Sequence, residues 1–412
     1  MVKLKSKINL VYFIEELEKT RRYQEGRVTF DASFMGLRLV EQILYSYLEY
    51  NPQIPELVMK GIISSAIFNI AKHKITLSGL LQEITKHENK YLSLPIQKFY
   101  LITTLSIDRY SKIPLIRMND VTFTFKSTLS HQFQNSRNKL QDRVQRLYVT
   151  KIPENYLYVQ GSTHSRTPEE AFEKIFTELS YLRFFWNFYY LRKKGFTFHF
   201  GGSDILKPLN LIIPGPFHTV HDEKGKIEED IFYYNEKFLW PISATSILND
   251  YDELWKFHRK YVKKFSKHLY RDEIKKGLLM YVNALDEYQI GNAFIKLWSV
   301  IEYWTGSWNK DDSIQRLCFL FKDASYNKQI LTHLKEYRNR IIHGDYYNQD
   351  EKDFLFQLLY YVNSILSFHI WNKYGFKTIE DTYEFLSIPS DEVEILMKID
   401  LYKKASNFRG VI

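Results

Sequence analysis

Three polar side chains that can do chemistry together lie near the end of one predicted helix. Arg338, Asn339 and His343 occur in the segment YRNRIIHGDY, residues 337–346. At about 100° per residue, Asn339 and His343 lie about 40° apart on a helix, so both can meet the same ligand. Arginine carries a fixed positive charge, and histidine exchanges a proton near neutral pH. The segment therefore predicts a site that binds an anion and transfers a proton.

Arg338 occupies a position where the helix would be expected to carry an apolar residue. On a helix from about 328 to 343, one arc of about 100° holds Arg338 together with Leu331, Leu334, Ile341 and Ile342. A buried, unpaired guanidinium costs several kcal/mol, so we expect an acidic partner, a polar cavity or a bound anion beside it. The alternative is a surface arginine that extends to solvent or a structural ion pair. Gly344 predicts that the helix ends in a left-handed conformation.

The segment Arg338–Gly344 resembles the motif of the HEPN superfamily, in which an arginine, usually followed by a polar residue, precedes a histidine. It is most similar to the Apea-like branch. Two apolar segments, 293–306 and 351–371, lie where that family places the neighbouring helices. The resemblance covers roughly residues 275–375. It implies a small helical bundle that pairs with a second copy and, in active members, cuts RNA without a metal or a cofactor.

The resemblance implies a role for each residue in attack of the ribose 2′-hydroxyl on the adjacent phosphate. His343 would act as general acid or base, Arg338 would stabilise the developing negative charge, and Asn339 would hydrogen-bond to the phosphate or the imidazole. One copy offers one such histidine. Two His343 side chains that face each other across a twofold axis would fill both proton-transfer roles, so we expect a homodimer.

Two further residues are predicted to assist. Glu302 lies on the flank of a predicted helix, 290–305, where it would pair with Arg338 or Arg340 and orient them; the alternative is a solvated glutamate. Arg340 lies almost opposite the apolar arc of its helix, which favours a contact with the RNA backbone or with solvent.

Composition limits the class of protein. The 412 residues suggest two or three domains, and 45% hydrophobic residues with 31 Tyr and 30 Phe can fill large cores. The single cysteine, Cys318, excludes an intramolecular disulfide and a thiol cluster for zinc. We find neither an apolar signal-peptide region nor an uninterrupted apolar span of roughly 20 residues, so we expect a cytoplasmic protein that does not enter a membrane.

The net charge of +9 fits a polyanionic partner such as RNA. Basic residues concentrate in 254–276, around a helical series of apolar residues. This run predicts either an RNA-binding surface or a solvated helix face, and its members are Lys256, Arg259, Lys260, Lys263, Lys264 and Lys267. A second run, 136–151, has the same two interpretations and carries Arg137, Lys139, Arg143 and Arg146.

The first half of the chain predicts mixed secondary structure. Apolar periodicity predicts mostly helix over 56–106, and aromatic and β-branched enrichment predicts strands at 121–125, 156–162, 196–200 and 209–215. Thr167, Pro168 and Glu170 predict the start of a helix over 168–193, which is apolar on most of its circumference and therefore buried. We expect an exposed loop over 214–230, with His218 and His221 solvated rather than bound to a metal.

Together these patterns predict an α+β N-terminal region followed by an all-α, HEPN-like helical bundle, mainly helical overall. We expect a regulatory or sensor region over 1–250, a basic helical connector over 251–275, the bundle over 276–376 and a helical extension over 377–412. The resemblance to the HEPN superfamily implies a metal-independent endoribonuclease in bacterial antiviral defence, in which RNA cleavage by a toxin-like effector produces abortive infection. The N-terminal region would hold it silent until an unknown phage-derived or nucleotide trigger arrives. The alternatives are a non-catalytic HEPN-like module for RNA binding or dimerisation, and a helical scaffold in which Arg338 and His343 are structural.

Overall fold

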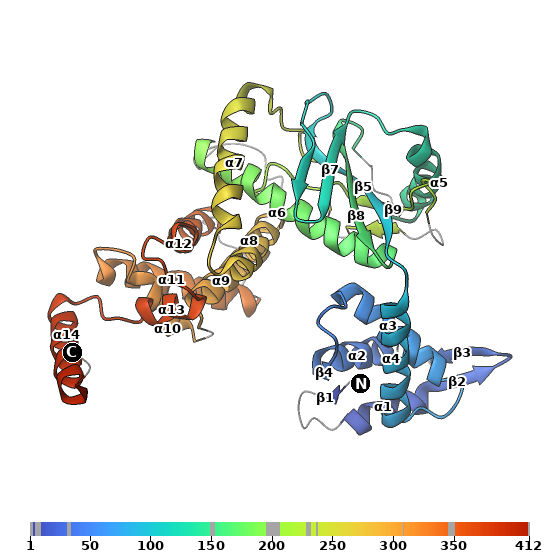
Figure 1. Cartoon of the computed structure of the whole chain (residues 1–412), viewed down its shortest axis with the longest axis horizontal. Coiled ribbons are helices and arrows are strands. Elements are labelled where there is room, and N and C mark those ends of the chain that lie inside the picture. Colours follow the sequence, from blue (N-terminus) through green and yellow to red (C-terminus); the bar gives the residue numbers. More distant parts are fainter. Residues whose placement is uncertain are drawn as a thin grey trace.

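The structure of the protein is a computed structural model. It describes residues 3–4, 10–30, 34–148, 153–194, 207–227, 232–235, 238–307, 309–344 and 351–410. As predicted, the chain is mainly helical and its N-terminal part is an α+β region (Figure 1).

The first elements form a unit with a hydrophobic core of its own, here called the N-terminal unit. Two antiparallel strand pairs accompany its helices: β1 (Lys3–Leu4) with β4 (Leu48–Glu49), and β2 (Arg21–Gln24) with β3 (Arg27–Phe30). The helices are α1 (Leu10–Thr20), α2 (Phe34–Tyr47), α3 (Glu56–Ile70) and α4 (Leu77–Ser93). Their buried residues run from Leu10 to Tyr91 in one cluster, the N-terminal core.

A six-stranded antiparallel sheet follows, with the strand order β10-β9-β5-β8-β7-β6 among the described residues. Its longest strand pairs with neighbours on both sides, so that Ile102 lies opposite Gln160 on one and Thr219 on the other. The strands are β5 (Gln97–Asp108), β6 (Ile116–Met118), β7 (Val121–Lys126), β8 (Tyr156–Ser165), β9 (Phe217–His221) and β10 (Phe232–Tyr234).

The strands predicted at 121–125 and 156–162 are confirmed as β7 and β8. The helix predicted to continue to 106 is wrong, because α4 ends at Ser93 and residues 97–108 form β5. The strand predicted at 209–215 is reduced to an isolated antiparallel bridge between Pro214 and Leu105 of β5. Side chains take part in holding this segment, since Asn187 Oδ1 accepts a hydrogen bond from the backbone of Ile212 and Ser106 Oγ accepts one from Ile213. The segment 196–200 lies outside the described residues.

The loop predicted over 214–230 is partly wrong. Phe217–His221 is strand β9, and all five residues are buried. His218 and His221 are therefore core residues, 2% and 1% exposed, rather than solvated loop histidines. Thr103 Oγ1 lies 2.6 Å from His218 Nδ1, and Thr219 Oγ1 lies 2.8 Å from His221 Nε2.

The long helix α6 (Pro168–Lys194) lies along the sheet and touches most other parts of the molecule (Figure 1). Its predicted start is confirmed, since Thr167 Oγ1 accepts a hydrogen bond from the Glu170 backbone at 3.3 Å. Its predicted burial is confirmed too, because every residue from Leu179 to Tyr190 is less than 9% exposed. The helix α5 (His131–Tyr148) carries the second basic run. Arg137 in this run is not solvated, because it is 1% exposed and donates to Ile102 O, Thr219 Oγ1 and Phe217 O.

Eight helices complete the described chain. The predicted helices 290–305 and 351–371 are confirmed as α9 and α12. Their bounds are α7 (Tyr251–Ser266), α8 (Arg271–Leu285), α9 (Ile290–Thr305), α10 (Lys310–Cys318), α11 (Ala324–Ile342), α12 (Glu351–Trp371), α13 (Ile379–Leu386) and α14 (Glu392–Arg409). Helices α8 to α12 pack on one another with α9 in the middle. Their buried residues join those of the sheet and α6 in a single cluster, the main core.

Two observations concern the chain ends and membranes. None of the residues of α14 is buried, and the helix projects from the rest of the molecule (Figure 1). Among the described residues, no helix has the length and apolar character needed to cross a membrane.

Candidate active site

The predicted catalytic residues lie at the C-terminal end of α11. Asp323 begins this helix, since its Oδ1 accepts a hydrogen bond from the Tyr326 backbone at 2.9 Å. The predicted left-handed Gly344 is confirmed, with a φ of +88°, but the helix ends at Ile342 and His343 is the residue that follows its last position. The backbone N of His343 donates to Asn339 O and Arg340 O, both at 3.1 Å. This ending places the imidazole at the surface of the molecule.

The apolar side of α11 holds the motif against the main core. Leu331, Leu334 and Ile341 are buried as predicted, and Tyr337 joins them. Tyr337 packs edge-on against Phe294 of α9, with 4.8 Å between ring centroids, and lies 4.7 Å from the ring of Phe354 in α12. Ile342, predicted to share this face, is instead 47% exposed. Three helices therefore fix the orientation of the motif.

Arg338 is half-buried and has no acidic partner among the described residues. Its Nη1 lies 3.4 Å from Asn339 Oδ1, a long hydrogen bond. Its Nε is buried and has no hydrogen-bond partner in the described part of the chain. A guanidinium in this state retains its charge and part of its hydrogen-bonding capacity, so it can bind an anion.

The structure brings Arg338 and Asn339 into contact and places His343 one helical turn further along, at the exposed end. Arg340 is exposed, and its guanidinium carbon lies 5.8 Å from the centre of the Tyr337 ring. Glu302 is 7% exposed, so the alternative of a solvated glutamate is wrong. Its pairing with Arg338 or Arg340 stays a prediction.

The basic run of α7 forms a charged face beside this bundle. Leu254, Tyr261 and Phe265 are buried, as the helical series predicts, and Phe257 packs against the main core. Five of the six predicted RNA-binding residues are exposed: Lys256, Arg259, Lys260, Lys263 and Lys267. The sixth, Lys264, donates to Trp371 O at 3.0 Å and is half-buried, so it is partly used to hold α7 on α12.

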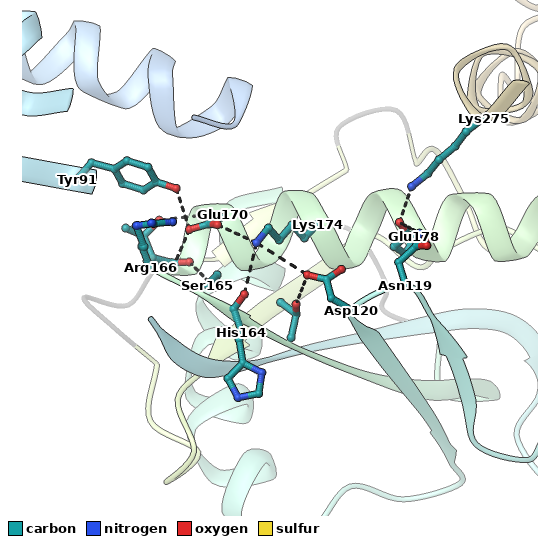
Figure 2. Close-up of polar contacts among 12 residues, drawn as sticks. Tyr91, Asn119, Asp120, His164, Ser165, Arg166, Glu170, Lys174, Glu178 and Lys275 are labelled. Atoms are coloured by element: carbon teal, nitrogen blue, oxygen red, sulfur yellow. Dashed lines mark hydrogen bonds and ion pairs between the residues drawn. The ribbon is translucent and has the colours of Figure 1, made fainter. Parts of the chain in front are cut away.

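One row of charged residues on α6 was missed by the sequence analysis (Figure 2). Glu170 accepts a hydrogen bond from Tyr91 Oη of the N-terminal unit at 2.8 Å, and Lys174 pairs with Glu170 at 2.9 Å. Glu178 pairs with Lys275 of α8 and accepts a hydrogen bond from Asn119 at 2.8 Å. The signal was present in the sequence, because these three residues recur every four positions on a helix that is otherwise mostly apolar.

A neighbouring glutamate also ties the N-terminal unit to α6. Helix α3 begins after Pro55, which provides no side-chain cap. Instead, the carboxylate of Glu173 accepts hydrogen bonds from the backbone N of Glu56 at 3.2 Å and of Leu57 at 2.8 Å. A carboxylate at this place satisfies free N–H groups and interacts favourably with the helix dipole. The first helical turn of one unit thus depends on a side chain of the next.

Among the described residues, no group of three or more histidine, cysteine or acidic side chains is arranged to hold a metal ion. No protein-family model matches the chain, and no curated protein or solved structure matches it either. The HEPN-like identity therefore stays a prediction that depends on α11 and the helices around it.

Proposed function

We propose that this chain is a metal-independent endoribonuclease of the HEPN type, with its active site at the end of α11. The observation that carries the proposal is the state of Arg338, a half-buried guanidinium that has no carboxylate partner among the described residues and precedes the exposed His343. A phosphate group of RNA would supply a negatively charged partner for this guanidinium. His343 then transfers a proton to or from the reacting oxygen, and Asn339 hydrogen-bonds to the phosphate or the imidazole.

The reaction follows from these roles. A base removes the proton of the ribose 2′-hydroxyl, whose oxygen attacks the adjacent phosphorus, and the bond to the 5′-oxygen of the next nucleotide breaks. Arg338 stabilises the extra negative charge of the transition state. The products carry a 2′,3′-cyclic phosphate and a 5′-hydroxyl. Pairing of two copies would supply a second His343 as the acid, and the basic face of α7 would steer RNA towards the bundle.

The decisive experiment is cleavage of total RNA and a labelled tRNA by the purified full-length chain in EDTA, with analysis of the product ends. We expect cyclic-phosphate ends from the wild type and their loss in His343→Ala and in Arg338→Ala. His333 provides the matched control, because it is an exposed histidine of the same helix whose ring packs against Phe354. His333→Ala should cleave as the wild type does.

Two outcomes would favour the alternatives. RNA binding without cleavage, unchanged in His343→Ala, would indicate a non-catalytic module. Loss of thermal stability in both motif variants, with no cleavage by the wild type, would indicate a structural role for Arg338 and His343. Sedimentation analysis of the wild type tests the proposed homodimer separately.

The contacts of α6 support a regulatory role for the N-terminal unit, which we include in the proposal. The carboxylates of Glu170 and Glu173 hold this unit, while Glu178 of the same helix holds α8 of the bundle. A trigger that moves the N-terminal unit would break the contacts of Glu170 and Glu173. The resulting shift of α6 would then move α8, which Glu178 holds. Cleavage that rises when Glu170 and Glu173 are both replaced by alanine would support this mechanism, and cleavage that stays unchanged would contradict it.

A further inference from the structure

A cavity of about 660 Å³ lies between α6, the β9–β10 edge of the sheet and the connection from α8 to α9. This volume is within the range of about 300–1,000 Å³ that is usual for small-molecule sites. Aromatic rings form much of its wall: Phe172, Phe176, Tyr233, Phe238 and Tyr288. Two of these rings, Phe172 and Tyr233, stack on each other with 3.7 Å between centroids and 8° between planes.

Three buried polar side chains of the lining each have a hydrogen-bonding atom that makes no hydrogen bond to the residues that the structure describes. Arg183 is 1% exposed; its Nε donates to Ile212 O at 3.0 Å and its Nη2 to Asp286 at 2.5 Å, which leaves Nη1. His218 has Nδ1 beside Thr103 Oγ1, which leaves Nε2. Ser180, 6% exposed, makes no side-chain hydrogen bond among the described residues. All three side chains line the same cavity, so these three polar atoms can form hydrogen bonds with a ligand there.

The charges in the lining select the kind of ligand. Arg183 is neutralised by Asp286, and Lys296 forms an ion pair with Glu287. Both cations among the described lining residues are thus paired, and a phosphate that bound either of them would have to displace its carboxylate. A flat ring with hydrogen-bond donors and acceptors along its edge satisfies both the aromatic wall and the polar atoms. Nucleobases have this combination, and proteins bind them by stacking together with hydrogen bonds to the base edge.

We propose that this cavity binds the base of a free nucleoside or nucleotide, with the ring against the aromatic wall and its edge towards Arg183, Ser180 and His218. The site lies between two parts of the main core. Arg183 and His218 belong to α6 and the sheet, whereas Asp286, Tyr288 and Lys296 belong to the α8–α9 corner of the bundle. A bound base thus joins the two parts. This proposal is independent of the nuclease, since it concerns a separate cavity and is tested without RNA cleavage.

Calorimetric titration of the full-length chain with adenosine, guanosine, cytidine and uridine tests the proposal. We expect at least one nucleoside to bind with a Kd below about 1 mM. Its 5′-monophosphate should bind with similar affinity, because both cations among the described lining residues are paired with carboxylates. The same titration with trinucleotides shows whether the site prefers a free nucleoside or a nucleotide within an RNA chain. No binding of any nucleoside would overturn the proposal, as would binding that requires the phosphate or the longer RNA.

Variants of Ser180 locate the site. Ser180→Leu places a larger side chain in the cavity and should weaken nucleoside binding by at least about tenfold. Thr177→Leu is the matched control on the same helix, outside the lining, and should bind as the wild type does. Ser180→Ala removes only the hydroxyl, so it covers the case in which the leucine variant does not fold, and it should bind more weakly than the wild type. Wild-type affinity in the folded Ser180 variants would overturn the assignment.

Discussion

Mild acid should destabilise this protein strongly, because four histidines are buried in the neutral state. His218, His221, His258 and His369 are each 6% exposed or less. Burial lowers the pKa of His218 and His369 to about 3 and that of His221 and His258 to about 4. In the unfolded chain these groups regain an ordinary pKa of about 6.5.

The sign and the size of the effect follow from these pKa values. Above pH 6.5 neither state binds the protons, and the folded state has no penalty. As the pH falls below 6.5, the unfolded chain binds protons that the folded chain cannot bind until about pH 3–4. Each histidine then lowers the free energy of unfolding by about 1.4 kcal/mol per pH unit. At pH 5.5 the four together lower it by about 5 kcal/mol, a large part of the 5–15 kcal/mol typical of folded proteins.

Urea unfolding at pH 7.5, 6.5 and 5.5 measures how the free energy of unfolding depends on pH. The variant His258→Phe shows how much of this dependence comes from one histidine. His258 lies among Phe185, Trp186 and Trp255, with its Nδ1 unpaired among the described residues, so a phenyl ring suits the site. The variant should lose about a quarter of the pH dependence and be about 1.4 kcal/mol more stable than the wild type at pH 5.5, relative to pH 7.5. His131→Gln is the control, because this side chain is exposed.

Two results would refute the reasoning. One is a free energy of unfolding that stays constant between pH 7.5 and 5.5. The other is a His258→Phe variant with the full wild-type slope.

Three further predictions concern α6, α8 and α7. Glu173→Ala removes the cap of α3 and should lower the stability of the N-terminal unit by about 1 kcal/mol. Amide exchange in the first turn of α3 should become faster. Equal exchange rates in this variant and in the control Asp142→Ala would contradict the capping role of Glu173. Gly277→Ala would place a Cβ 2.1 Å from Trp304 Cζ2 and should cost about 1–3 kcal/mol in urea unfolding, whereas Gly61→Ala, with open space around it, should be neutral or stabilising. Finally, three glutamate substitutions on α7 should weaken RNA binding and reduce its salt dependence more than three on α5. Equal effects would exclude α7 as the RNA surface. The α7 set is Lys256, Arg259 and Lys263, and the α5 set is Lys139, Arg143 and Arg146.

Local patterns in the sequence predicted the helices of the bundle and the start of α6, because caps and apolar periodicity act over a few residues. They failed for β5, whose residues from Leu101 to Ile107 are buried on both faces. A strand of this kind has no alternation of polar and apolar residues, so it resembles a buried helix. They failed for β9 because the glycine, proline and acidic residues around it are typical of loops.

The candidate site was predicted in part. The half-burial of Arg338 and the left-handed Gly344 follow from spacing and residue type alone. The contact between Glu173 and α3 could not be predicted. Glu173 is separated in the sequence from Glu56 by 117 positions and from Leu57 by 116, and no local pattern marks either partner. The cavity was missed for the same reason, since its walls come from α6, two strands and the bundle.

The separation of the N-terminal core from the main core determines which parts of this protein can be exchanged in evolution. The N-terminal core is complete by Tyr91, and the chain enters the sheet only a few residues later, after Pro95. Recombination between Tyr91 and the start of β5 could replace the N-terminal unit by another domain, provided that this domain offers hydrogen-bond donors to Glu170 and Glu173. The bundle has no such freedom, because its apolar side chains share the main core with the sheet and α6. Relatives of this chain should therefore differ in the N-terminal unit while they keep the sheet, α6 and the bundle as one inherited block.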